Sequence, residues 1–140
     1  MAEIKELRCV IGGCTHQIDD ITYTCPEHGE LGTLDILYDY DALKRTIDRD
    51  EISASRVMNS WRYKPLLPIA PDSKVPPLSV GWTPLYDSPR IAEVLGVRQA
   101  WVKDDGANPT GSLKDRASTL VLARALEQKI PIVSTASTGN

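Results

Sequence analysis

Residues 106–118 read GANPTGSLKDRAS, and the change of composition within this stretch decides where a helix begins. The first residues are glycine, asparagine, proline and threonine, which belong to turns and loops. Helix-forming residues follow, and Ser112 is a suitable N-cap with an acid, Asp115, three positions later, as in a capping box. The stretch therefore predicts a loop followed by a helix over residues 112–129.

Lys114 stands at the second position of this expected helix, where the helix dipole disfavours a cation by roughly 0.3–1 kcal/mol. A lysine that loses its proton readily is suited to imine formation with an aldehyde. An exposed lysine tolerated beside Asp115 explains the same position. A Walker phosphate loop does not fit, because Gly106 and Gly111 have its spacing but Lys114 comes two places late.

The composition is that of an ordinary globular protein and points to no polyanionic partner. The chain has 140 residues, 41% apolar and 25% charged, with a net charge of −3. This balance predicts neither a nucleic acid nor a membrane as partner. No apolar run approaches the length of about 20 residues that a membrane span needs. The N-terminus has neither a signal core nor a transit-peptide composition, so we expect a cytoplasmic protein.

Three segments differ in composition. Residues 1–37 hold every cysteine and histidine and predict a small knuckle. Residues 38–79 form a connector, with a short helix over 38–47 capped by Asp39 or Asp41, and then five prolines that predict extended chain. Residues 80–140 change to an α/β pattern.

Within this last segment, helices and strands are expected to alternate. Residues 88–96 predict a helix with Ser88 as N-cap, Pro89 at its first position and Gly96 at its end. A strand is expected over 99–104, and another from residue 130 after the second helix. The alternation predicts βαβ units on a parallel sheet. Because the last strand leads into a loop with no further helix, we interpret the sequence as the N-terminal portion of a longer protein.

The string WVKDDGANPTGSLKDRAS (101–118) closely resembles the lysine motif of the fold-type II pyridoxal-phosphate enzymes. It is most similar to the threonine synthase family, whose string is typically KxEGxNPTGSFKDR; Asp105 and Leu113 are mild departures. GWTPLYDSPRIAEVLG (81–96) is similar to the family's GxTPL segment, and STASTGN (134–140) to its STGN loop. The resemblance covers residues 81–140 and implies the start of a tryptophan synthase β-like α/β domain, truncated and preceded by a zinc-ribbon-like segment.

The resemblance also implies roles for individual residues. Lys114 would hold pyridoxal 5'-phosphate as a Schiff base and act as the catalytic base. Asn140 would hydrogen-bond the ring hydroxyl of the cofactor. The loop residues Ser137, Thr138 and Gly139 would bind the carboxylate of an amino-acid substrate. We expect Arg116 to pair with local acids or with the chain rather than with substrate.

The reaction implied is that of a lyase in threonine biosynthesis, the conversion of O-phospho-L-homoserine and water to L-threonine and phosphate. The glycine-rich phosphate loop and the partner of the pyridine nitrogen lie further along in the family. This chain alone is therefore expected to be inactive, and a homodimer is expected for the full-length protein. Cysteate synthase, threonine dehydratase and diaminopropionate lyase share the lysine motif and stay open as alternatives, as does a non-catalytic metal-binding or interaction fragment.

Cys9, Cys14, Cys25 and His28 have the spacing C-x4-C-x10-C-x2-H, and three thiolates with one imidazole suit a tetrahedral structural zinc site. CPEHG resembles a zinc-ribbon knuckle, and several threonine synthase relatives carry such a segment. The first pair departs from the usual C-x2-C, and His16 is a spare candidate. The alternative is a lapsed ribbon whose cysteines are small buried apolar residues.

Overall fold

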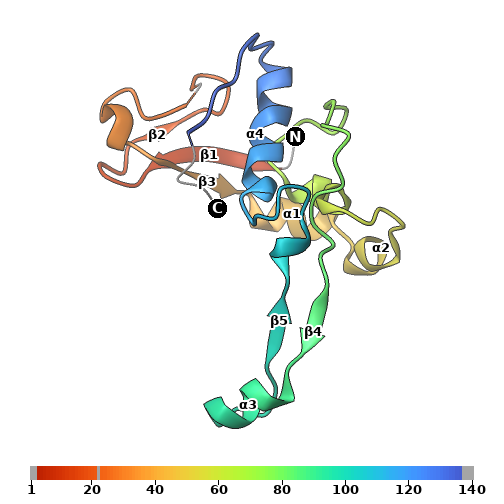
Figure 1. Cartoon of the computed structure of the whole chain (residues 1–140). Coiled ribbons are helices and arrows are strands. Elements are labelled where there is room, and N and C mark those ends of the chain that lie inside the picture. The colour runs from red at the N-terminus through yellow and green to blue at the C-terminus, as the bar shows by residue number, and fades with distance from the viewer. Residues whose placement is uncertain (1–2, 22, 137–140) are drawn as a thin grey trace. The chain divides into compact units, whose positions relative to one another are not determined.

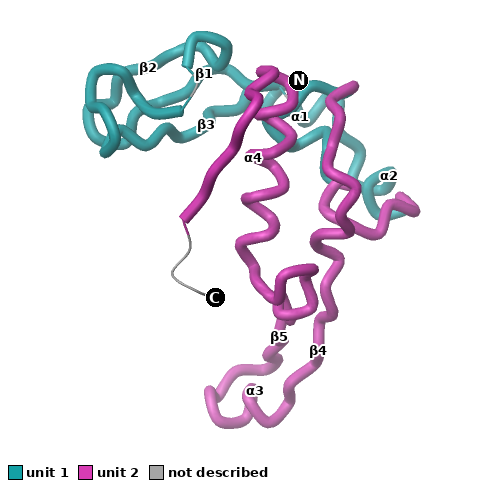
Figure 2. The backbone as a smooth tube through the Cα atoms, turned by 45° about the horizontal axis from the view of Figure 1, so that its top comes forward, with its two compact units in different colours: residues 1–54, 63–71 teal, residues 55–62, 72–140 magenta. Residues whose placement is uncertain are grey.

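The chain divides into two compact units, which are coloured separately in Figure 2. Unit 1 comprises residues 1–54 and 63–71, and unit 2 comprises residues 55–62 and 72–140. The computed structural model describes residues 3–21 and 23–136.

Unit 1 is built on a three-stranded antiparallel sheet of order β2-β1-β3 (Figure 1). Its strands are β1 (Ile4–Cys9), β2 (Thr15–His16) and β3 (Leu34–Tyr38). β1 pairs with β2 at Leu7–His16 and with β3 at Leu7–Ile36, with an irregularity between Ile4 and Glu6. The 3-10 helix η1 (Gly29–Leu31) precedes β3. The sheet therefore brings the β1–β2 turn and the segment before β3 to the same end of β1.

Two short helices follow the sheet, α1 (Tyr40–Thr46) and α2 (Arg49–Ala54). α1 confirms the sequence prediction, because Asp39 caps it by accepting the backbone N–H of Ala42 at 2.9 Å. The expected extended connector contains a further element, the 3-10 helix η2 (Ser60–Leu66), with Pro65 near its end.

Unit 2 contains β4 (Leu85–Asp87), α3 (Pro89–Leu95), β5 (Trp101–Lys103), the 3-10 helix η3 (Asp105–Ala107) and α4 (Asp115–Glu127). α3 begins and ends as predicted, with Gly96 in the left-handed conformation at its end. The side chain of Ser88 makes no capping bond to α3. α4 is the longest helix of the described chain and buries small or polar residues, among them Thr119, Ala123 and Ala125.

The expected parallel sheet is wrong for the described residues. β4 and β5 pair antiparallel, with Leu85 opposite Lys103 and Asp87 opposite Trp101. The physical reason is the connection: α3 and its short loops turn the chain back beside β4 instead of carrying it across the sheet, as a parallel crossover requires. The strand expected from residue 130 is also absent, since residues 130–136 are exposed and form no strand.

The boundary of the second helix also differs from the prediction. Regular α4 begins at Asp115, so Lys114 flanks the helix instead of standing at its second position. The fold is a mixed α/β arrangement, as expected. None of the described helices has the length and apolar character needed to cross a membrane.

Candidate functional sites

The first candidate site is the loop that leads into α4 and carries Lys114. The Lys114 side chain is exposed, and its backbone N–H donates to Ser112 Oγ at 3.2 Å. The predicted N-cap at Ser112 is wrong, because Lys114 holds the N-cap position of α4 and no side chain caps the helix there. Asp115 does not complete a capping box with Ser112. Instead its carboxylate accepts from the backbone N–H of Thr110 at 2.9 Å and from the Thr110 hydroxyl at 2.5 Å. These bonds between Thr110 and Asp115 span Lys114 and hold the loop around it in place.

Asp105 ties this loop to the segment around Thr83. Arg116 donates to both carboxylate oxygens of Asp105, from Nε at 2.8 Å and from Nη2 at 2.7 Å. Thr83 Oγ1 donates to the same carboxylate at 2.6 Å. The Arg116 guanidinium, followed by the Thr83 hydroxyl, holds the pKa of Asp105 well below its usual range. The expected pairing of Arg116 with a local acid is confirmed.

A second set of bonds joins the same two segments through Asn108. Its side-chain oxygen accepts the backbone N–H of Gly81 at 2.9 Å, and its amide donates to the backbone oxygen of Asp105 at 3.0 Å. Gly81 has φ +83°, and a Cβ there would lie 2.3 Å from Ser60 Oγ, so the position requires glycine. Residues 81–83 and 105–116, which are parts of the two strings that carry the family resemblance, thus form one hydrogen-bonded cluster in unit 2.

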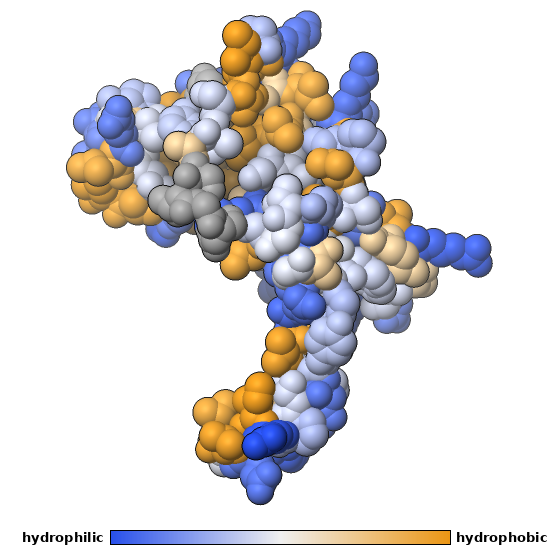
Figure 3. Space-filling model, viewed as in Figure 1, coloured by the Kyte–Doolittle hydropathy of each residue, from blue (hydrophilic) through white to orange (hydrophobic). Residues whose placement is uncertain are grey.

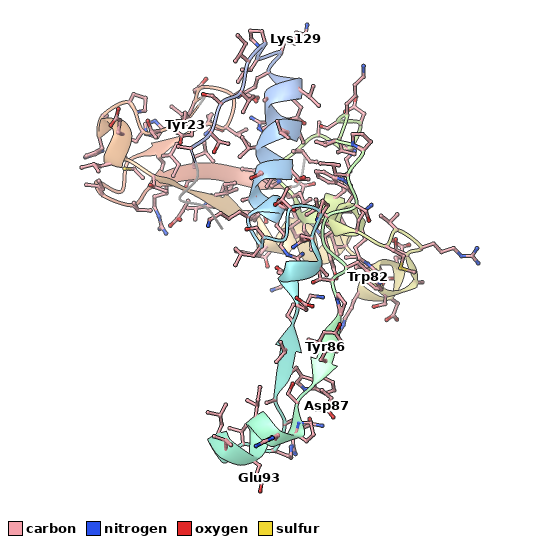
Figure 4. The ribbon with its side chains drawn as sticks, in the orientation of Figure 1. Tyr23, Trp82, Tyr86, Asp87, Glu93 and Lys129 are labelled. Atoms are coloured by element: carbon pink, nitrogen blue, oxygen red, sulfur yellow. The ribbon has the colours of Figure 1, made fainter. Side chains whose placement is uncertain are left out.

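Sequence reasoning missed two residues of this cluster, Arg62 and Trp82. The Arg62 guanidinium carbon lies 3.9 Å from the centroid of the Trp82 ring, a cation–π contact. Trp82 has φ +54°, a left-handed conformation that costs energy for a residue with a side chain. Figure 4 places Trp82 just before β4. No local pattern signals this contact, because the partners are twenty residues apart in sequence and one of them is held in a strained conformation.

The remaining predicted cofactor and substrate residues cannot be placed beside Lys114. Asn140, Ser137, Thr138 and Gly139 lie outside the described residues. Their roles stay predictions.

The second candidate site is a cluster of Cys9, Cys14, Cys25 and His28 at one end of the unit 1 sheet. Their ligand atoms lie within 4.8 Å of one another. The two knuckle turns bring them together: the Cys9 N–H donates to the Cys14 oxygen at 2.9 Å, and the His28 N–H donates to the Cys25 oxygen at 3.2 Å. The four-residue spacing of the first pair therefore still closes a turn.

The three separations between His28 Nδ1 and the sulfurs match the edges of a tetrahedral zinc site, whereas the one sulfur–sulfur separation is shorter than such an edge. His28 Nδ1 lies 3.6, 3.7 and 3.5 Å from the sulfurs of Cys9, Cys14 and Cys25, and the last two sulfurs are 3.4 Å apart. Zn–S and Zn–N bonds of about 2.3 and 2.0–2.1 Å give edges of about 3.5 Å between sulfur and nitrogen and about 3.8 Å between sulfurs. The donor set and its size therefore fit zinc.

The described structure also distinguishes the two histidines. His16 Nε2 lies 3.4 Å from the sulfur of Cys25 and groups with Cys14 and Glu27, not with all three sulfurs. His28 is the one that faces the complete set of thiols. His16 instead lies where a residue would contact the ligand Cys25 without binding the metal itself.

Cys9, Cys14 and Cys25 form no disulfide, and the pKa values of the Cys9 and Cys14 thiols are shifted in opposite directions. Backbone hydrogen bonds from Gly12, and then Ile11, lower the pKa of the Cys9 thiol against the effect of burial. The neighbouring Cys25 thiol, with burial, raises the pKa of Cys14 to about 12. Without a nearby cation, ionisation of one of two close thiols disfavours ionisation of the other, because like charges repel.

Comparison with known proteins shows similarity to one enzyme family and to several of its relatives. Residues 77–140 match the model of the pyridoxal-phosphate dependent enzyme family. The chain is 42% identical over 133 residues, 95% of its length, to a threonine synthase of Methanocaldococcus jannaschii, and 38% identical over 134 residues to one of Methanosarcina acetivorans. A threonine synthase of Synechocystis is 44% identical over 86 residues, 57% of this chain and 22% of that protein. No solved structure matches.

The lysine loop lies within residues 77–140, the region that matches the pyridoxal-phosphate dependent enzyme family. Over most of its length the chain is similar to threonine synthases. The chain spans about a third of the length of the first two of these relatives, 32% and 31%.

Proposed function

We propose that the chain is the N-terminal portion of a cytoplasmic threonine synthase that converts O-phospho-L-homoserine and water to L-threonine and phosphate. The observation that carries the proposal is the Lys114 loop. It presents an exposed lysine between Ser112 and Asp115 and is bonded to the segment around Thr83 through Asp105 and Asn108. Similarity to threonine synthases over 95% of the chain supports the choice of reaction within the family.

The residues of this loop fit a cofactor that attaches through an aldehyde. Lys114 is exposed, and the bonds made by Asp115 and Ser112 hold its backbone in one conformation. Pyridoxal 5'-phosphate, when bound, supplies an electron sink for carbanions. Lys114 would hold the cofactor and then move protons at Cα and Cβ of the substrate. Asn140 would orient the cofactor ring, and Ser137, Thr138 and Gly139 would bind the substrate carboxylate.

The other residues that bind the cofactor are proposed to lie in the part of threonine synthases that this chain does not span. Residues 1–140 alone are therefore expected to bind the cofactor weakly or not at all, and to be inactive. Borohydride reduction followed by peptide mass analysis checks this. A reduced cofactor on Lys114 of the isolated chain would contradict it.

The function itself is tested in a chimera of residues 1–140 with the unmatched part of the Methanocaldococcus threonine synthase. We expect threonine and phosphate from O-phospho-L-homoserine, and borohydride labelling at Lys114. Lys114→Ala should lower the rate by about 10²- to 10⁴-fold or more, the scale of a positioned proton-transfer group. Lys74→Ala, which removes an exposed lysine from the same unit, is the matched control and should keep the wild-type rate.

The outcomes of this experiment separate the alternatives. Labelling at Lys114 with sulfite rather than water as the productive nucleophile favours a cysteate synthase, and deamination of threonine favours a dehydratase. A folded chimera with neither labelling nor turnover contradicts the enzyme and leaves a non-catalytic metal-binding fragment.

We also propose that Cys9, Cys14, Cys25 and His28 bind one structural zinc ion. The proposal rests on the tetrahedral separations around His28 Nδ1. All four positions are taken up by protein atoms, as in structural rather than catalytic zinc sites. Metal analysis of the purified protein is the test, and less than one zinc per several chains contradicts the proposal.

Gly12 is expected to be needed for the orientation of His28. A Cβ at residue 12 would lie 2.2 Å from His28 Cε1 and 2.6 Å from Nε2, so Gly12→Ala must displace the ring. We expect zinc affinity to fall by about tenfold to a hundredfold, the usual effect of disturbing a ligand's surroundings, as measured by competition with a chromophoric chelator. Gly13→Asn is the control in the same turn. A Cβ there meets nothing within 4 Å, and asparagine tolerates its φ of +71°. Equal affinities for the two variants would contradict the close approach to His28.

A further inference from the structure

A second group of metal-binding side chains lies directly beside the proposed zinc site. Cys14, His16 and Glu27 offer a sulfur, an imidazole nitrogen and a carboxylate oxygen that all lie within 4.8 Å of one another. Cys14 is a member of both groups, whereas His16 and Glu27 belong only to the second. The two groups therefore adjoin and share one thiol.

The backbone of unit 1 brings these three side chains together. Cys14 comes directly before β2, which contains His16, and residues two apart in extended chain point to the same side. Glu27 lies in the knuckle turn that the His28 N–H closes by donating to the Cys25 oxygen at 3.2 Å. The two turns that assemble the first group therefore assemble the second as well.

The second group is more open to solvent than the first. Cys9 and Cys25 are 1% and 0% exposed, whereas Glu27 is exposed and Cys14 and His16 are half-buried. Figure 3 shows hydrophilic residues at this end of unit 1, where β2 and η1 lie. Within the described part of the chain, no fourth cysteine, histidine or acid joins these three residues. Three protein ligands with one position left to water are the form of an open zinc site, not of a closed structural one.

The charge of the first group, once it holds zinc, favours a second cation. Cysteine binds zinc as a thiolate and histidine binds it as a neutral ring. Three thiolates against the two positive charges of Zn²⁺ therefore leave one negative charge at the first group. The carboxylate of Glu27 adds another within 4.8 Å of the Cys14 sulfur. A second divalent cation between Cys14 and Glu27 is attracted by both charges.

We propose that Cys14, His16 and Glu27 bind a second divalent cation, of the zinc type, and that the Cys14 thiolate bridges the two ions. Mixed sulfur, nitrogen and oxygen donors suit Zn²⁺, and a zinc-bound thiolate keeps lone pairs for a second ion. The inference rests on the proposed structural zinc site, which supplies the shared thiolate and the negative charge. It goes further by assigning His16 and Glu27, which the first ion does not use.

The test is a titration of residues 1–140 with Zn²⁺ under reducing conditions, followed by native mass spectrometry and by competition with chromophoric chelators of graded affinity. We expect two ions per chain. The second should bind at least about tenfold more weakly than the first, because it has three protein ligands instead of four and shares one of them.

Two variants assign the second ion to its ligands. Glu27→Gln and His16→Ala should each keep the first ion and weaken the binding of the second at least about tenfold. Glu27→Gln changes only an exposed side chain, so the circular dichroism of the chain should stay the same. Glu30→Gln is the matched control: it removes the same charge from an exposed position of η1 outside both groups, and both affinities should keep their wild-type values.

Loading the chain with Cd²⁺ tests the bridge. Two cadmium nuclei that share a thiolate split each other's NMR resonances. We therefore expect two split resonances in the wild type and one unsplit resonance in Glu27→Gln. Two unsplit resonances in the wild type would remove the bridge and overturn the inference.

The remaining outcomes separate the two metal proposals. One ion per chain at saturating Zn²⁺, lost in His28→Ala and kept in His16→Ala, overturns the second site alone. A second ion that Glu30→Gln weakens as much as Glu27→Gln is held by surface charge, and this result also overturns the inference. A chain that binds no ion contradicts both proposals.

Discussion

His28→Ala is expected to abolish stoichiometric zinc binding, whereas His16→Ala keeps one zinc per chain. The difference follows from geometry, because His28 Nδ1 lies 3.5–3.7 Å from all three sulfurs, while His16 Nε2 contacts the sulfur of Cys25 at 3.4 Å. Loss of one of four ligands from a structural site should lower affinity by at least about a hundredfold. Metal content of the purified variants and chelator competition are the measurements.

The loss of zinc should also unfold the sheet of β1, β2 and β3. The buried apolar residues of this region are few, and two of them, Cys9 and Cys25, are proposed ligands. Without the ion, the Cys25 sulfur 3.4 Å from the Cys14 sulfur keeps the pKa of Cys14 raised. The free energy of metal binding in such small sites is folding free energy. We expect the wild-type chain treated with chelator and the His28→Ala variant to lose hydrogen-exchange protection across β1 alike.

Cys25→Ser and His16→Ala serve as paired controls. Cys25→Ser removes a ligand without a change of size and should behave as His28→Ala does. His16→Ala should retain the hydrogen-exchange protection of β1. Its zinc affinity should fall by no more than about tenfold to a hundredfold, the effect of losing a residue that contacts a ligand without binding the metal. If His16→Ala loses the metal and His28→Ala keeps it, the assignment of ligands is reversed.

Local signals predicted those parts of the fold that depend on neighbours in sequence. Asp39, Pro89 and Gly96 fix the ends of α1 and α3 through capping and left-handed backbone, both of which act within one turn. The spacing of Cys9, Cys14, Cys25 and His28 likewise predicted a cluster, because each pair closes a short turn. The direction of β5 could not be predicted in this way. An alternation of helix and strand does not distinguish a crossover from a chain that turns back on itself.

The candidate sites also combine features that local sequence predicts with features that depend on residues distant in sequence. The Lys114 loop was identified from its own residues and from the resemblance of the string. The bonds of Asp105 to Thr83 and of Asn108 to Gly81 join residues 22 and 27 positions apart, and no periodicity encodes such pairs. The positive φ of Trp82 has no signal in sequence either, since tryptophan does not favour it. Such a conformation persists where surrounding contacts impose it, here those of Gly81, Thr83 and Arg62.

Asp105→Asn is expected to loosen the whole cluster that joins residues 81–83 to residues 105–116. The amide offers one acceptor oxygen where the carboxylate serves the two donors of Arg116 and the hydroxyl of Thr83. Bidentate bonds between ions are the strong ones, so their loss should raise the hydrogen-exchange rate of residues 81–83 at least about tenfold and lower the denaturation midpoint of unit 2. Asp87→Asn removes an exposed carboxylate of β4 in the same unit and should leave both quantities close to wild type. A wild-type exchange rate in Asp105→Asn would show that Asn108 alone holds the segment.

The same carboxylate predicts the pH dependence of this cluster. Arg116 and Thr83 lower the pKa of Asp105 from its ordinary value of 3.8, so the folded state binds the proton more weakly than the unfolded state. The stabilisation is therefore complete above the ordinary carboxyl pKa and is lost as the pH falls below it towards the folded value. The difference in denaturation midpoint between wild type and Asp105→Asn should be constant from neutral pH to about pH 5 and then shrink as the pH falls further. A difference that grows on acidification would contradict the assignment of Asp105 as the charged centre of the cluster, because a protonated carboxyl cannot bind Arg116 as an ion pair.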